Sequence, residues 1–255
     1  MSLRNKTIIV TGVSSGIGAD FAKYARFQGA HVIGLDRKAP SITLHDFYQT
    51  DLGNPSDIDA TVKKLPSSID ALANIAGVPG TAPLELVGRV NYLGLRHLTL
   101  SLLDRIPSGG AIVNISSILG GRWAERLELH RDLAKTQSFE EGLRWLAEHP
   151  VDHETCYQYF KEALIVWNIT QWQPHFLQRG VRMNCVAPGP VFTPILNDFT
   201  TMLGSERVNS DNKRIKRPAF SDEIAEPIGF LCDDDSRWVS GAVLPVDGGM
   251  ASTYI

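Results

Sequence analysis

Hydrophobic and polar positions along this chain form short apolar runs separated by longer amphipathic segments. The apolar run at residues 7–10 leads into a glycine-rich turn, after which Phe21, Ala22 and Ala25 fall at helical spacing. A second short apolar run occupies residues 31–35. This order of strand, helix and strand predicts an α/β domain with a doubly wound, mostly parallel sheet.

A segment near the middle of the chain, residues 122–152, also has an amphipathic pattern. Its apolar residues stand among charged ones and include Trp123, Leu127, Leu129, Leu133, Phe139, Leu143, Trp145 and Leu146. The spacing predicts one or two helices, with Pro150 ending the second. We expect the apolar stripe to pack against its own domain or a neighbouring subunit; the alternative is that it forms a wall of a substrate pocket.

The length and charge of the chain limit the classes of protein to which it can belong. A length of 255 residues suits one domain, 1–255, and 25 basic side chains nearly balance 28 acidic ones. No basic block indicates a nucleic-acid surface, and no apolar run is long enough to span a bilayer. We therefore expect a cytoplasmic protein that binds neither nucleic acid nor membrane.

Cysteine and histidine usage adds two expectations. Three cysteines without a CxxC pair indicate reduced thiols that fill the interior, although Cys156 could instead be reactive. The seven histidines lack metal-binding spacing, so we expect no metal site. His130, His149 and His153 are expected on the surface, with substrate contact as the alternative.

The glycine-rich turn, residues 11–18, has the composition of a phosphate-binding loop. Gly12 can supply a tight turn, Gly16 lets backbone amides approach a pyrophosphate, and Gly18 lets the helix pack closely on the strand. The spacing Gly-x3-Gly-x-Gly departs from the G-x-G-x-x-G pattern, and the Gly-Lys-Ser/Thr ending of a nucleoside-triphosphate loop is missing. The remaining candidate ligands in this turn are Ser14, Ser15 and Ile17.

Asp36 ends the second predicted strand, twenty residues after Gly16. A carboxylate at this place can bind the adenosine ribose hydroxyls and would repel a 2'-phosphate. Arg37 follows directly and could soften that discrimination. We therefore expect NAD as cofactor, with NADP less favoured.

Tyr157 and Lys161 are four residues apart in a segment that reads as helix, so the ammonium lies beside the phenol. A nearby positive charge favours the phenolate and lowers the tyrosine pKa from its ordinary value of about 10. A bound, positively charged nicotinamide would act in the same direction. The pair therefore predicts a tyrosine that can exchange a proton at neutral pH.

Together these motifs resemble the short-chain dehydrogenase/reductase family, over residues 6–249, which implies a Rossmann fold. By this resemblance Ser117 is the catalytic serine, Tyr157 the base, Lys161 its partner, and Asn91 the anchor of a water in the proton relay. Further cofactor contacts implied in the first half are Asp51, Leu52, Asn74, Ala76 and Gly77. In the second half they are Pro188, Gly189, Val191 and Thr193, together with Tyr157 and Lys161.

The resemblance also implies a substrate lid over residues 192–215, with apolar residues that favour an apolar or aromatic substrate. Candidate substrate contacts are Ser117, Trp123, Tyr157, Pro190, Phe192 and Phe199. Within the family, the long segment 122–152 resembles members that oxidise a phenylpropenyl alcohol to its aldehyde and, as an alternative, members that act on 3α-hydroxysteroids.

The implied activity is hydride transfer between an alcohol and a nicotinamide cofactor, in a homo-oligomer, most simply a dimer. A different class, a dinucleotide-binding regulator without catalysis, would not need serine, tyrosine and lysine at these spacings.

Overall fold

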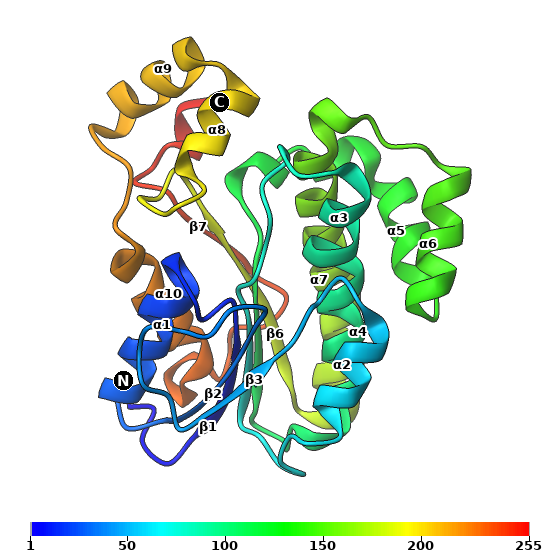
Figure 1. Cartoon of the computed structure of the whole chain (residues 1–255), viewed down its shortest axis with the longest axis vertical. Coiled ribbons are helices and arrows are strands. Elements are labelled where there is room, and N and C mark those ends of the chain that lie inside the picture. Colours follow the sequence, from blue (N-terminus) through cyan, green and yellow to red (C-terminus); the bar gives the residue numbers. More distant parts are fainter. Residues whose placement is uncertain (1, 255) are drawn as a thin grey trace.

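The computed structural model describes residues 2–254 and has a central parallel sheet of seven strands in the order β3-β2-β1-β4-β5-β6-β7 (Figure 1). The strands are β1 Thr7–Thr11, β2 His31–Asp36, β3 Asp46–Gln49, β4 Ala71–Asn74, β5 Ala111–Ile115, β6 Arg182–Pro188 and β7 Val243–Val246. The predicted doubly wound α/β fold is confirmed. Strand order reverses between β1 and β4, and ligands of such folds bind outside the carboxyl ends of the strands at this point.

Helices cover both faces of the sheet. They are α1 Gly16–Phe27, α2 Pro55–Val62, α3 Leu84–Gly88, α4 Leu95–Leu102, α5 Leu127–Lys135, α6 Phe139–Glu148, α7 Cys156–Arg179, α8 Leu196–Leu203, α9 Ser205–Ile215 and α10 Ser221–Cys232. In Figure 1, α1 and α10 lie on one side of the sheet, and α2, α4 and α7 lie on the other. None of the helices within residues 2–254 combines the length and the apolar character needed to cross a membrane.

Each face of the sheet carries its own hydrophobic core. Along β1, Ile9 packs with the core under α4 and α7, whereas Ile8 and Val10 pack with the core under α1 and α10. Central parallel strands are buried on both faces, and this explains why they read as continuous apolar runs in the sequence. The three cysteines are free and buried, as expected.

The segment 122–152 folds into α5 and α6 (Figure 1). Helix α5 packs beside α7 of the same chain, and α6 packs against α5 and the π-helical turn Arg89–Gly94. Leu133 and Phe139 are buried in the core shared with α4 and α7. The buried Arg96 of α4 donates to the backbone carbonyls of Leu133 (3.0 Å) and Thr136 (2.5 Å) at the end of α5. These contacts tie the segment to the domain through both apolar packing and hydrogen bonds.

The expectation of a surface position for His130 was wrong, because this side chain is fully buried. It stands one helical turn before Leu133, on the face of α5 that meets α7. Its Nε2 lies 3.0 Å from a carboxylate oxygen of buried Glu162, which also accepts a hydrogen bond from Arg126 (2.8 Å). A hydrogen-bonding partner across the interface explains how a polar ring occupies an apolar face.

Candidate active site

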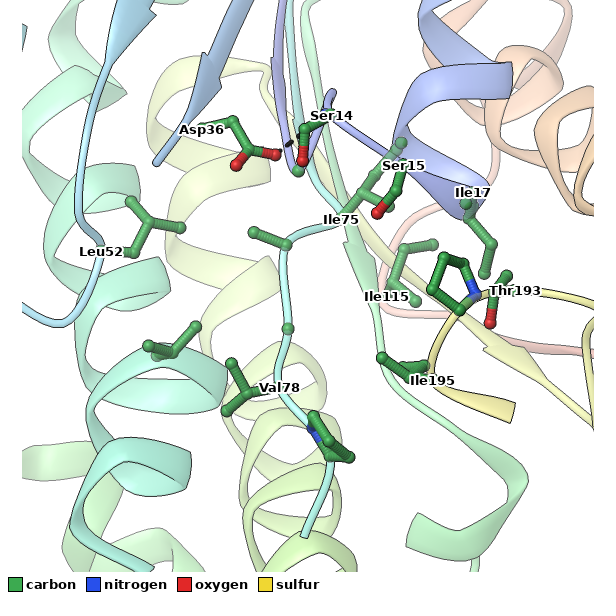
Figure 2. Close-up of a pocket in the computed structure, with 18 of the residues that line it drawn as sticks. Ser14, Ser15, Ile17, Asp36, Leu52, Ile75, Val78, Ile115, Thr193 and Ile195 are labelled. Atoms are coloured by element: carbon green, nitrogen blue, oxygen red, sulfur yellow. Dashed lines mark hydrogen bonds between the residues drawn. The ribbon is translucent and has the colours of Figure 1, made fainter. Parts of the chain in front are cut away.

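A cavity of about 400 Å³ opens at the carboxyl ends of the strands (Figure 2). Asp36 and Leu52 lie toward one end of it, and Thr193 and Ile195 lie toward the other. The predicted residues that line this cavity are Gly12, Ser14, Ser15, Gly16, Ile17, Gly18, Asp36, Arg37, Asp51, Leu52, Ala76, Gly77, Ser117, Tyr157, Lys161, Pro188, Gly189, Val191, Thr193 and Phe199. The fold thus gathers residues from six strand ends, those of β1 to β6, around one elongated space.

The glycine turn between β1 and α1 forms part of the cavity wall and has no room for side chains at Gly12 and Gly18. Gly12 has φ +80°, and a Cβ atom there would lie 2.9 Å from the Ala76 backbone. A Cβ atom on Gly18 would lie 2.1 Å from the Gly12 carbonyl oxygen. Gly16 begins α1 and has φ +55°. Because Gly16, Ile17 and Gly18 line the cavity, the amino end of α1 faces it. This arrangement suits a pyrophosphate, which needs close backbone approach and a helix amino terminus.

The Asp36 carboxylate is held in place at one end of the cavity. One of its oxygens accepts a hydrogen bond from the Ser14 backbone amide at 2.9 Å, as Figure 2 shows. The other accepts from the Lys38 amide at 3.0 Å. Arg37 and Lys38 line the same end of the cavity, so one negative and two positive side chains lie where a ribose would bind.

Ser117, Tyr157 and Lys161 meet at the cavity wall, and all three are buried. Tyr157 and Lys161 lie one turn apart on α7, and Ser117 follows β5 directly. Lys161 Nζ donates to the Ile115 carbonyl at 2.8 Å, and Ser116 Oγ donates to the Lys161 carbonyl at 3.0 Å. These two bonds fix the lysine turn of α7 against the end of β5.

Burial shifts the pKa values of the two titrating groups in opposite directions. Desolvation raises the pKa of Tyr157 above its ordinary value, although a hydrogen bond with Ser117 works against that shift. Burial lowers the pKa of Lys161 to about 8. The expected lowering of the Tyr157 pKa is not present in the protein by itself, because burial has the largest effect on this group. The Lys161 ammonium lies 5.6 Å from the ring centroid.

Asn91 and Asn74 lie behind the cavity wall. Asn91 is on a π-helical turn, Arg89–Gly94, and its side-chain amide accepts from the Val78 amide (2.8 Å) and donates to the Val78 carbonyl (2.9 Å). Asn74 Nδ2 donates to Thr99 and Asn114, both at 2.9 Å. Asn91 thus fastens the loop after β4, and Asn74 links β4 to α4 and β5 through its amide nitrogen. The Asn74 Oδ1 atom is buried without a hydrogen-bond partner within residues 2–254, and neither asparagine lines the cavity.

The segment after β6 covers the Tyr157 end of the cavity with α8. The Phe199 ring lies edge-on to the Tyr157 ring, with 5.2 Å between centroids. Asp198 accepts a hydrogen bond of 2.6 Å from Thr81, and the Met202 sulfur lies 3.3 Å from the Gly80 amide. This helix therefore closes over Tyr157 through two hydrogen bonds and the Phe199 ring.

Three predicted substrate contacts do not line the cavity. Trp123 lies in the 3₁₀ turn Trp123–Arg126, Pro190 accepts a backbone hydrogen bond from Ala219, and Phe192 packs its half-exposed ring against Phe220. The cavity is also lined by residues that were not predicted as contacts, among them Val78, Pro79 and Ile195. The signal for Ile195 was the apolar pattern of the lid, in which it stands three residues after Phe192.

Comparison with protein families gives two matches that cover most of the chain. A model described as "short chain dehydrogenase" matches residues 6–126, and one described as "Enoyl-(Acyl carrier protein) reductase" matches residues 144–251. The gap between them falls within the segment that forms α5 and α6. No group of three or more His, Cys, Asp or Glu side chains within residues 2–254 is arranged to hold a metal ion.

Individual relatives give a more specific picture. The chain is 58% identical to a coniferyl-alcohol dehydrogenase from a Pseudomonas species, over 100% of both chains. It is 28% identical to the 3-alpha-hydroxysteroid dehydrogenase/carbonyl reductase of Comamonas testosteroni, over 95% of both. The crystal structure of a Pseudomonas 3-alpha-hydroxysteroid dehydrogenase complexed with NADH matches with a TM-score of 0.80 and 29% identity, over 97% of this chain and 98% of that one.

Proposed function

Because the chain belongs to the short-chain dehydrogenase/reductase family, we propose that it interconverts coniferyl alcohol and coniferyl aldehyde by hydride transfer to and from a nicotinamide dinucleotide. The likeness to a coniferyl-alcohol dehydrogenase over the whole chain carries this proposal. The convergence of Ser117, Tyr157 and Lys161 at one cavity supports it chemically. An apolar lid helix over Tyr157 suits an aromatic substrate.

We propose NAD as the cofactor in preference to NADP. The glycine turn fits a pyrophosphate, since Cβ atoms at Gly12 and Gly18 would clash with backbone. The fixed Asp36 carboxylate would accept hydrogen bonds from ribose hydroxyls and repel a 2'-phosphate. Arg37 and Lys38 beside it reduce this repulsion, so the preference is expected to be moderate rather than absolute.

The proposed chemistry assigns one task to each catalytic side chain. When bound, a nicotinamide would supply the hydride-accepting chemistry. Ser117 hydrogen-bonds the alcohol oxygen and stabilises its developing negative charge. Tyr157 removes the hydroxyl proton, and its phenolate is favoured by Lys161 together with the positive charge of the oxidised ring.

Proton release from Tyr157 is proposed to proceed through Lys161 toward Asn91. Gly77 separates these two groups, because a Cβ atom there would lie 3.8 Å from Lys161 Nζ and 3.3 Å from Asn91 Oδ1. The Asn91 side chain is already engaged with Val78. Asn91 would therefore act through the position of its backbone rather than through its side-chain amide.

The assay that tests the substrate follows the absorbance of reduced nicotinamide with NAD or NADP and a panel of alcohols. The panel holds coniferyl, cinnamyl and benzyl alcohols and a 3α-hydroxysteroid. We expect coniferyl alcohol with NAD to give the highest kcat/KM. Turnover of the steroid alone would favour the second candidate activity, which is supported by the fold match of TM-score 0.80.

Replacing Tyr157 with Phe separates catalysis from a purely regulatory role of the dinucleotide site. We expect kcat to fall by about 100- to 10,000-fold, because the general base is removed. Cofactor affinity, measured by fluorescence titration, should change by less than about threefold. Unchanged turnover in this variant would contradict the assignment of Tyr157 as the base and leave the regulator as the better description.

We further propose that the protein is a cytoplasmic homodimer. Three buried free thiols suit a reducing compartment. An open edge strand, β7, and the exposed Trp238 side chain near it offer a surface for a second copy.

A further inference from the structure

A second cavity, of about 670 Å³, lies beside the catalytic segments and shares no lining residue with the first. Its walls come from the segment after β5, the start of the inserted segment, α7, α9 and the residues after β7. The insertion and the lid therefore both contribute walls to this cavity.

The chain connects this cavity directly to the catalytic groups. Ser117 lines the first cavity, and the next two residues, Ile118 and Leu119, line the second. In the same way Tyr157 lines the first and Gln158 lines the second. The lid spans both cavities, with α8 over Tyr157 and α9 at the wall of the second.

The charged side chains at the second cavity are paired with one another. Arg122 lies 2.7 Å from Glu125, Arg126 lies 2.8 Å from Glu162, and Arg207 lies 3.8 Å from Asp211. Three positive and three negative groups give no net charge to attract an ion. The paired charges therefore favour a neutral ligand over a phosphate or a carboxylate.

The uncharged part of the wall suits an aromatic ring with a hydroxyl group. Ile118, Leu119 and Met250 provide apolar surface. The Gln158 side-chain oxygen is buried and lacks a hydrogen-bond partner within residues 2–254. A buried acceptor of this kind favours a ligand that can donate a hydrogen bond.

We propose that the second cavity binds the hydroxylated ring of the substrate while the alcohol end reaches Ser117 and Tyr157, with α8 and α9 moving to join the two spaces. Gln158 accepts the hydrogen bond of the ring hydroxyl. This inference rests on the proposed oxidation of an aryl alcohol. It makes the inserted segment, through Arg126, a wall of the substrate site as well as a packing element.

The test compares two alcohols that differ in the ring. Coniferyl alcohol carries a ring hydroxyl, and cinnamyl alcohol does not. In the Gln158→Met variant we expect kcat/KM for coniferyl alcohol to fall about tenfold, mainly through KM, because a uniform binding contact is lost. For cinnamyl alcohol it should change less than twofold. The ratio of the two values is independent of the fraction of folded protein.

The Gln137→Met variant is the matched control, because Gln137 is exposed on the loop between α5 and α6 and does not line either cavity. It should leave the ratio at the wild-type value. A ratio unchanged in Gln158→Met would overturn the inference while leaving the proposed function intact. Failure of the wild-type protein to oxidise either alcohol would overturn both.

Discussion

Lys161 illustrates how one buried side chain can oppose folding while it holds a proposed role in the chemistry. Burial lowers its pKa from 10.5 to about 8. Between these pH values the unfolded chain keeps a proton that the folded protein has released, so this group makes the free energy of unfolding rise with pH. The full contribution is about 3 kcal/mol over the whole window.

We therefore predict that wild-type protein without cofactor gains stability relative to the Lys161→Met variant as pH rises from 8 to 10.5. Met cannot titrate, and the other groups contribute alike to both proteins. Thermal unfolding midpoints measured at half-unit intervals of pH check this. A midpoint difference that moves in favour of the variant with rising pH would mean that the fold raises the lysine pKa.

Asp36 offers a second prediction at the scale of one residue. The Asp36→Asn variant keeps the size of the side chain and removes the charge that repels a 2'-phosphate. We expect kcat/KM with NADP to rise about tenfold relative to the value with NAD, since Arg37 and Lys38 remain at the same end of the cavity.

The control for this charge is Asp46→Asn on β3, where the carboxylate faces His31 and does not line the cavity. It should leave cofactor preference unchanged. Equal shifts in both variants would show that net charge, rather than the position of Asp36, governs the choice of cofactor.

The sequence could predict residues whose positions are dictated by backbone geometry. Gly12, Gly16 and Gly18 line the cavity because strand, turn and helix are continuous in the chain. Tyr157 and Lys161 meet because helical spacing places them together. Trp123 and Phe192 could not be placed in this way, since their orientation depends on contacts such as that of Phe192 with Phe220.

At the scale of elements, the lid helix α8 is fastened by few contacts. The Thr81→Val variant removes the hydrogen bond to Asp198 and leaves the Phe199 ring contact and the hydrogen bond that the Gly80 amide donates to the Met202 sulfur. A helix held less firmly should be more open, so we expect KM for the alcohol to rise about two- to tenfold, equivalent to the loss of one hydrogen bond. Limited proteolysis of residues 196–215 should also be faster.

The Thr201→Val variant makes the same chemical change on α8 itself, where the hydroxyl contacts only its own helix at the Asn197 carbonyl. This control should behave as wild type. If Thr81→Val leaves both KM and proteolysis unaltered, the Thr81–Asp198 bond does not hold the lid.

The insertion shows the limit of an amphipathic pattern. The apolar stripe predicted helices, and α5 and α6 are present. The pattern did not distinguish the domain interior from a subunit neighbour, because both offer apolar surface. His130 was misplaced because its buried partner, Glu162, lies 32 residues away in the chain and on another helix.

At the scale of the whole molecule, the strand order brings segments that are distant in the sequence together at the carboxyl ends of neighbouring strands. β1, β4 and β5 are neighbours in the sheet although they are separated by more than 100 residues from Thr7 to Ile115. The glycine turn and Ser117 therefore meet at the same cavity. This convergence depends on connectivity, and the resemblance to a family could predict it where local periodicity could not.

The edge of the sheet formed by β7 offers a surface for self-association. β7 pairs only with β6, and Trp238, in the turn before β7, is 88% exposed. Its ring centroid lies 6.4 Å from that of Phe176, which in turn lies 6.1 Å from that of Trp172. Trp172 and Phe176 are partly buried, so Trp238 is the exposed member of this aromatic cluster. An exposed aromatic side chain beside an open strand edge is typical of protein interfaces.

We predict that the protein sediments as a dimer at micromolar concentration and that Trp238→Lys shifts it toward monomer by at least tenfold in dissociation constant, because a charge would be buried against apolar side chains. Phe27→Lys is the matched control, since Phe27 is 89% exposed at the end of α1 and lies outside this cluster. A wild-type monomer would refute the dimer. If Trp238 lies at the interface, Phe27→Lys should leave the dimer dissociation constant unchanged. An equal increase of this constant in both variants would instead argue against a specific interface at Trp238.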